Sequence, residues 1–262
     1  MTRTVLILGS LGAALLLAAC NDDDAPFAGT GTPVTPAASA ATGSWQGSID
    51  TPLANSRTAR AVVLADGSFW MTYSQVGDAT TAGIIRGTGS SDGSVFSVDN
   101  ATLISLEDGS RSVADITANF VGRSSLNGTI TQEGTTALPS PATFSSLYRS
   151  AFDQTLTLAD LAGIYEGVIT TGLGEESASF AIDASGALAG GSASGCSVNG
   201  QATAQPSGNV FNINASFGSE DACGANRAVS VVGILSLEVD TLTALALNDG
   251  STNSFIFTGT RP

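Results

Sequence analysis

The chain carries the same series of short segments twice, in the same order, and this repetition restricts the folds open to it. GSWQGSID, for example, returns as GIYEGVIT after an offset of 120 residues. The matching pairs lie at 43–50 and 163–170, 65–69 and 184–188, 93–98 and 208–213, and 142–149 and 253–261. Such self-similarity is the sequence signature of a duplicated architecture. We therefore predict two tandem domains, 43–150 and 151–262, each of the usual domain size.

Within each half, apolar and polar residues alternate over short stretches. Trp45, Gly47 and Ile49 alternate with polar neighbours, and Tyr165, Gly167 and Ile169 recur at the matching positions of the second half. A period of two with one apolar face is typical of half-buried antiparallel strands. Each half is therefore expected to be built from strands.

Asp-Gly and Asn-Gly dipeptides separate these stretches, and both tolerate the positive φ angles of tight hairpin turns. We predict turns at Asp66-Gly67, Asp92-Gly93, Asp108-Gly109, Asn127-Gly128, Asn199-Gly200 and Asp249-Gly250. Short strands joined by frequent turns predict an all-β chain with two tandem antiparallel barrels or sandwiches. The Gly-x-aromatic-x-Gly first strand of each half resembles small lipocalin-type barrels of lipoprotein domains. That resemblance implies an aromatic plug at one end of each barrel.

The N-terminus has the features of an export signal. Residues 1–19 join a positive start at Arg3 to an apolar stretch that is shorter than the roughly 20 residues needed to span a bilayer. Leu17-Ala18-Ala19-Cys20 then resembles the lipobox of bacterial lipoproteins. The resemblance implies cleavage before Cys20 and a thioether-linked diacylglyceryl group on it, with acyl chains such as palmitate. Such chains would attach the protein to a membrane.

Residues 20–42 are small, polar and Pro-rich, so we expect a disordered, flexible tether. Residue 21 is Asn and not Asp. In enteric lipoproteins, the absence of Asp at this position favours sorting to the outer membrane. The expected location is the cell envelope of a Gram-negative-type bacterium, as an outer membrane lipoprotein. Whether it faces the periplasm or the cell surface stays open.

The charge composition excludes several classes of function. The formal net charge is −14, and all nine basic residues are Arg. Such a chain is not expected to bind nucleic acid, because phosphate binding depends on clustered Lys and Arg. The chain has no His, which excludes Ser–His–Asp triads, Cys–His pairs and histidine metal ligands.

The chain has three cysteines. With Cys20 lipidated, as the lipobox resemblance implies, Cys196 and Cys223 remain as an even number in an oxidising compartment. We therefore expect these two to form a disulfide.

No motif in the chain specifies a catalytic, cofactor or metal site. Asp-Gly-Ser repeats lack the converging oxygens of a calcium loop, and hairpin turns explain them. The acid pairs Glu175-Glu176 and Glu220-Asp221 are interpreted as solvated loops, although two carboxylates at a defined separation would suit a hydrolase.

Trp70 is a candidate interface residue. If Phe69, Met71 and Tyr73 face inward, Trp70 faces out, because side chains alternate across a strand. It then either anchors a partner, or packs against the other domain or under a loop.

These features together predict a lipid-anchored envelope protein with a non-enzymatic binding or interaction role. The partner is an unidentified protein or small molecule. The alternatives are a lipocalin-like carrier of a small apolar ligand and a carboxylate-dependent hydrolase.

Overall fold

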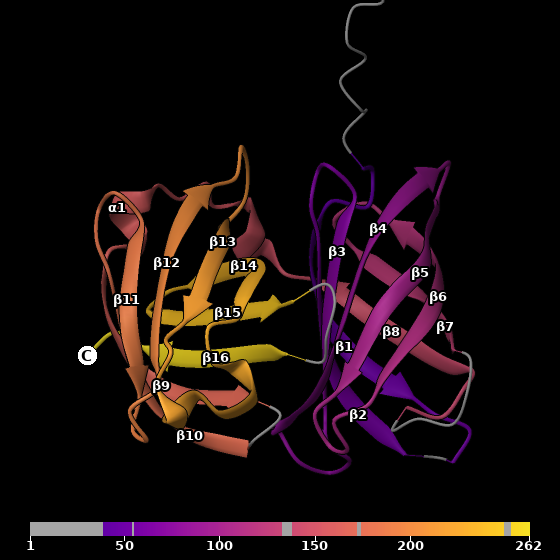
Figure 1. Ribbon diagram of the computed structural model, residues 1–262. Coiled ribbons are helices and arrows are strands. Elements are labelled where there is room, and N and C mark those ends of the chain that lie inside the picture. The colour runs from indigo at the N-terminus through magenta and orange to yellow at the C-terminus, as the bar shows by residue number, and fades with distance from the viewer. Residues whose placement is uncertain (1–38, 54, 133–137, 172–173, 249–252) are drawn as a thin grey trace, which may run out of the picture. The chain divides into compact units, whose positions relative to one another are not determined.

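A computed structural model describes residues 39–53, 55–132, 138–171, 174–248 and 253–262. These form two closed antiparallel β-barrels within one compact unit, Pro36–Pro262. The predicted signal peptide, Cys20, most of the predicted tether and Asp249-Gly250 lie outside the described residues. In Figure 1 the first barrel runs from indigo to magenta and the second from orange to yellow.

The strands of the first barrel are β1 Gly43–Asp50, β2 Ser56–Val63, β3 Ser68–Ser74, β4 Thr81–Asp92, β5 Val95–Ser105, β6 Arg111–Val121, β7 Ser125–Gln132 and β8 Ala142–Tyr148. Those of the second are β9 Gly163–Thr171, β10 Gly174–Ile182, β11 Ala187–Ser192, β12 Ser197–Ala204, β13 Val210–Phe217, β14 Ser230–Glu238, β15 Thr241–Leu247 and β16 Ser254–Thr260. The short helices are η1 Ser150–Asp153, α1 Leu158–Leu161 and η2 Asp221–Asn226.

Each strand pairs with the next, and the last strand of each set pairs with its first. The all-β, tandem prediction is therefore confirmed, and closure decides between the alternatives of barrel and sandwich. The four pairs of matching sequence segments fall on equivalent elements. The first lies on β1 and β9, the second on the β2–β3 and β10–β11 turns, the third on β5 and β13, and the fourth on β8 and β16.

A glycine in the first strand of each barrel lets the ring close. A Cβ atom at Gly47 would lie 1.8 Å from the carbonyl oxygen of Ser145 on β8. At the matching Gly167, a Cβ would lie 2.0 Å from the carbonyl oxygen of Thr258 on β16. Only glycine fits where two backbones approach this closely.

The aromatic residue two positions earlier is buried inside its barrel. The Trp45 Nε1–H donates to the Ala41 carbonyl at 3.2 Å, and the Tyr165 hydroxyl donates to the Leu161 carbonyl at 2.7 Å. In both barrels the aromatic polar atom reaches the carbonyl oxygen four residues earlier in the chain. These bonds satisfy the polar end of a side chain that is otherwise surrounded by apolar atoms.

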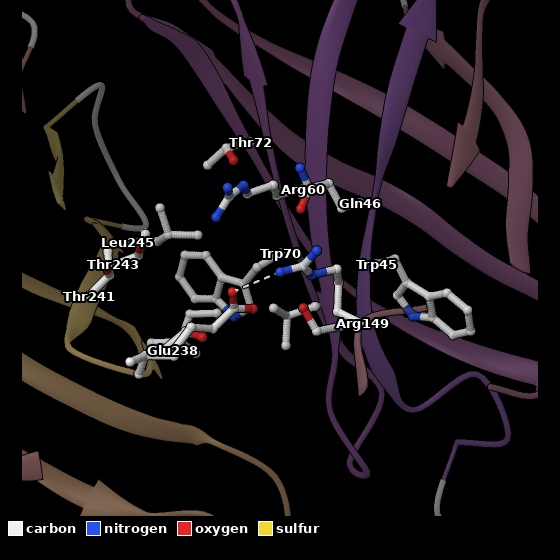
Figure 2. Close-up of a pocket in the computed structure, with 15 residues that line it drawn as sticks. Trp45, Gln46, Arg60, Trp70, Thr72, Arg149, Glu238, Thr241, Thr243 and Leu245 are labelled. Carbon is white, nitrogen blue, oxygen red and sulfur yellow. Dashed lines mark hydrogen bonds and ion pairs between the residues drawn. The ribbon is translucent and has the colours of Figure 1, made fainter. Parts of the chain in front are cut away.

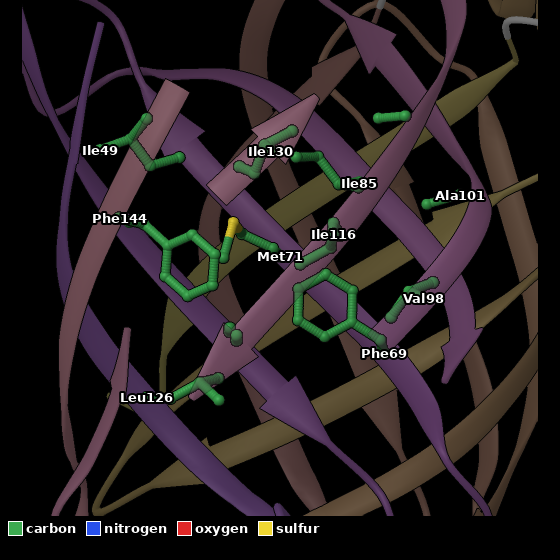
Figure 3. Packing of buried hydrophobic residues seen from close by; sticks show 14 of the residues in the cluster. Ile49, Phe69, Met71, Ile85, Val98, Ala101, Ile116, Leu126, Ile130 and Phe144 are labelled. Atoms are coloured by element: carbon green, nitrogen blue, oxygen red, sulfur yellow. The ribbon is translucent and has the colours of Figure 1, made fainter. Parts of the chain in front are cut away.

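The inward positions of the barrels are occupied by large apolar side chains. Figure 3 shows Phe69, Met71 and Phe144 packed across the interior of the first barrel. In the second, Phe180 and Phe257 meet edge to face with ring centroids 4.7 Å apart. A cavity between such side chains in the second barrel measures about 10 Å³. That is about the space of a single water, so a small apolar ligand does not fit there.

Two of the predicted hairpin turns are wrong. Gly67, Gly93 and Gly109 do have positive φ angles in turns, but Asn127-Gly128 lies within β7 and Asn199-Gly200 within β12. A Cβ at Gly128 would lie 2.3 Å from the Thr117 carbonyl oxygen, and one at Gly200 would lie 2.6 Å from that of Asn214. These glycines permit close strand pairing instead of a turn, a use that the dipeptide pattern does not distinguish.

Cys196 and Cys223 form a disulfide, with an S–S distance of 2.02 Å. Cys196 directly precedes β12, and Cys223 lies in η2, between β13 and β14. The bond therefore ties the η2 loop to the wall of the second barrel.

Candidate functional site

The outer faces of the two barrels share an apolar cluster. Its members come from β2 to β5 and the residue after β2, from η1, and from β13 to β16. They are Val62, Leu64, Trp70, Ile84, Ile104, Phe152, Val210, Ile234, Leu245, Leu247 and Ile256. Trp70 is 4% exposed in this cluster, so it packs against the second barrel.

Strands at this contact carry apolar residues on both faces. An alternating apolar–polar pattern therefore did not predict most of the residues in the cluster. In β16, Phe255 and Phe257 point into the barrel, while Ile256 between them joins the cluster outside. Strands buried on both faces read as continuous apolar runs. Such runs were the available sequence signal, but they do not say which surface covers the outer face.

A pocket of about 280 Å³ opens beside this cluster. Residues of β1, β2 and β3 together with Arg149 line it on the side of the first barrel. Residues of β14 and β15 and the turn between them line the opposite side. Figure 2 shows Arg60 and Arg149 extending from the first barrel toward Glu238 and Leu245 of the second.

Strand register brings the polar residues of the first barrel into the pocket. Arg60 on β2 lies directly opposite Gln46 on β1 and Thr72 on β3. Their neighbours on those strands, such as Ala61 and Met71, are buried in the barrel core. The alternation of side chains therefore places Arg60, Gln46 and Thr72 together on the outer face.

Arg149 is held at the end of β8. Its backbone N–H donates to the Ser44 carbonyl at 2.8 Å, which continues the pairing of β1 and β8. Beside it, the Tyr148 ring meets Trp45 edge to face, and the Tyr148 hydroxyl donates to Asp153 at 2.6 Å. Burial, then this hydrogen bond to the carboxylate, raises the pKa of Tyr148 to about 12.

The pocket contains two guanidinium groups and one carboxylate. Arg149 Nη2 lies 3.2 Å from Glu238 Oε2, an ion pair that joins the two barrels. Arg60 is exposed and has no ion-pair partner within the described part of the chain. The guanidinium of Arg86 lies 4.9 Å from the ring centroid of Trp70, a cation–π contact. Trp70 therefore contacts the guanidinium of Arg86 and lines the same pocket as Arg60, Arg149 and Glu238.

The acid pairs considered for catalysis are engaged in local hydrogen bonds. Glu175 accepts from the Thr170 hydroxyl at 3.1 Å, and Glu176 accepts from the Ser194 backbone N–H at 3.0 Å. Hydrogen bonds from its own backbone and from the Ser197 hydroxyl lower the pKa of Glu220. A general acid requires a raised carboxyl pKa, so this environment does not suit that role.

The pocket between the barrels offers a single carboxylate, that of Glu238. Across residues 39–262, apart from the undescribed gaps, no group of three or more acidic or cysteine side chains could hold a metal ion. Among the described residues, no helix is both long and apolar enough to cross a membrane.

Comparisons with solved structures give remote likenesses. No protein-family model and no curated protein sequence matches the chain. A candidate outer membrane protein from Bacteroides fragilis is 12% identical, with 84% of this chain and 98% of that chain covered and a TM-score of 0.28. A tryptophan-to-alanine variant of transferrin binding protein B, a vaccine antigen of Haemophilus parasuis, is 10% identical. The alignment with this variant covers 80% of this chain and 67% of the variant's chain, with a TM-score of 0.27. Both TM-scores are too low for either likeness to indicate the function of this protein.

Proposed function

We propose that this protein is a lipid-anchored, non-enzymatic envelope protein that binds a small molecule in the pocket between its two barrels. The observation that carries the proposal is the pocket itself, which combines an apolar floor with convergent charged and hydroxyl groups. Small-molecule sites are mainly apolar concavities with a few placed polar groups, often between domains. The filled interior of the second barrel favours this location over a lipocalin-like site inside it.

The membrane attachment rests on the N-terminal sequence. Leu17-Ala18-Ala19-Cys20 supports lipidation of Cys20, and Asn21 supports retention at the outer membrane. Two or three acyl chains hold a protein far more firmly than one, so no apolar segment of the barrels is needed for anchoring.

Replacing Cys20 with Ser tests the anchor. The variant should move from the detergent phase to the aqueous phase in detergent partitioning of whole-cell extracts. A Cys196→Ser variant should stay in the detergent phase, because its lipobox is intact. A Cys20→Ser protein that remains with the detergent would contradict the anchor.

A thermal-shift screen of the purified protein against neutral, cationic and anionic metabolites tests the pocket. A ligand at 100 times its Kd stabilises the folded state by about 2.7 kcal/mol. For a unit of this size that corresponds to a rise in Tm of roughly 5–10 °C. Thr243 lines the pocket, so a Thr243→Trp variant, which fills it, should lose the shift.

Thr117→Trp is the matched control, because Thr117 is an exposed residue on β6. This variant should keep the ligand-induced shift. The proposed site is wrong if no compound raises Tm, or if the shift persists in Thr243→Trp.

A further inference from the structure

We infer that the ligand of this pocket is a small organic carboxylate with an apolar or aromatic body. Its carboxylate would be held by Arg60 and Arg149, and its body would lie against Trp70. This inference rests on the proposed binding role of the pocket and specifies the chemical class of ligand.

The distribution of charge is the first argument. The chain carries 9 basic and 23 acidic side chains, yet the pocket is lined by two arginines and one glutamate. A cavity whose charge opposes that of the whole protein concentrates ligands of the opposite sign to its own walls. The surrounding acidic surface repels anions, so a bound anion needs these two guanidinium groups.

The guanidinium group of Arg60 can donate hydrogen bonds to a ligand. Its side chain is exposed, has no ion-pair partner among the described residues, and lies between Gln46 and Thr72 in the strand register. A guanidinium presents parallel N–H groups that match the two oxygens of a carboxylate. The Gln46 amide and the Thr72 hydroxyl provide further hydrogen-bonding groups beside it.

Arg149 already binds a carboxylate, that of Glu238. The side chains of this pair are 45% and 26% exposed, so water reaches both groups. Ion pairs of this exposure contribute little net free energy, because solvation competes with them. A ligand carboxylate can therefore replace Glu238 as the acceptor of Arg149, and Glu238 acts as an internal competitor.

The apolar floor determines the rest of the ligand. Trp70 and Val62 of the first barrel face Ile234 and Leu245 of the second. A volume of about 280 Å³ lies just below the usual range of ligand pockets, about 300 to 1,000 Å³. This size suits a one- or two-ring acid better than a long acyl chain or a folded segment of a partner protein.

Calorimetric titration with a matched pair of probes tests the inference. The probes are naphthalene-2-carboxylate and its neutral analogue, naphthalene-2-carboxamide. The full chain carries Cys20→Ser, so that no acyl chain binds the probes. The carboxylate should bind, and the amide should bind at least about tenfold more weakly, a difference of roughly 1.4 kcal/mol.

Variants of the charged residues should change the Kd for the carboxylate in opposite directions. Arg60→Gln and Arg149→Gln should each raise the Kd for the carboxylate about tenfold, whereas Glu238→Gln should lower it because the competitor loses its charge. Arg227→Gln is the control, since Arg227 pairs with Asp221 and does not line the pocket. If Arg60→Gln does not fold, Arg60→Lys should retain weakened binding of the carboxylate.

The outcomes separate this inference from the proposed function. Equal binding of both probes, abolished by Thr243→Trp, would overturn the anion specificity and leave the pocket as a binding site. Weaker binding in Glu238→Gln would overturn the competition between Glu238 and the ligand. Failure of both probes to bind would overturn the inference, and a screen without any hit would overturn the binding role as well.

Discussion

Replacing Gly47 with Ala introduces a methyl group where the first and last strands of the first barrel meet. The new Cβ would lie 1.8 Å from the Ser145 carbonyl oxygen, whereas ordinary contact begins at 3.4 Å. The strands must therefore separate by about 1.6 Å, the difference between these two distances. This displacement breaks about two or three backbone hydrogen bonds of the β1–β8 pairing, each with a net contribution of about 1 kcal/mol. We expect Gly47→Ala to lower the free energy of unfolding by about 3 kcal/mol.

Urea unfolding, monitored by far-UV circular dichroism, measures this loss. Gly167→Ala should produce a similar loss in the second barrel, because its Cβ would lie 2.0 Å from the Thr258 carbonyl oxygen. Gly122→Ala is the control, since a methyl group there would meet nothing within 4 Å beyond its chain neighbours, and it should change stability by less than about 0.5 kcal/mol. If Gly47→Ala unfolds at the same urea concentration as Gly122→Ala, close strand approach does not explain the repeated glycine.

Three further predictions concern the barrel contact, the disulfide and alkaline stability. Trp70→Ala should lower the free energy of unfolding by about 3–5 kcal/mol, as for a buried tryptophan, whereas a change under about 0.5 kcal/mol in urea unfolding would place Trp70 at an exposed surface. Replacing both Cys196 and Cys223 with Ser should cost about 3–4 kcal/mol from chain entropy for a separation of 27 residues, and an unchanged urea midpoint would refute this. The pKa of Tyr148 is raised to about 12, so its contribution to stability is present below the unfolded value of about 10 and is lost as the pH rises to 12. Tyr148→Phe should therefore show a smaller fall in Tm between about pH 10 and 12, and an equal fall would count against the shift.

The strand architecture was readable because its signals are local. Alternation around Trp45 and Tyr165 identified the first strand of each barrel, and the repeated segments identified equivalent strands. The exceptions, Asn127-Gly128 and Asn199-Gly200, have the same composition as true turns. Only the neighbouring backbone shows that glycine there serves close pairing, since a Cβ would meet the adjacent strand.

The candidate site was only partly accessible from the sequence. Alternation placed Trp70 on the outer face of its strand, but it did not reveal that the second barrel covers it. Arg60 and Arg149 are far apart in sequence and carry no motif. Arg60, Arg149 and Glu238 line one cavity only because register and barrel closure bring β2, the end of β8 and the end of β14 together, and there Arg149 pairs with Glu238.

The sequence by itself determined the all-β character and the duplication, because these follow from residue periodicity and repetition. The tertiary structure decided that the sheets close into barrels, that their interiors hold their own side chains, and that a charged pocket lies between them. These properties depend on contacts between residues distant in the chain. A single strand specifies which of its faces is apolar, but the surface that covers each face is chosen by the packing of the whole unit.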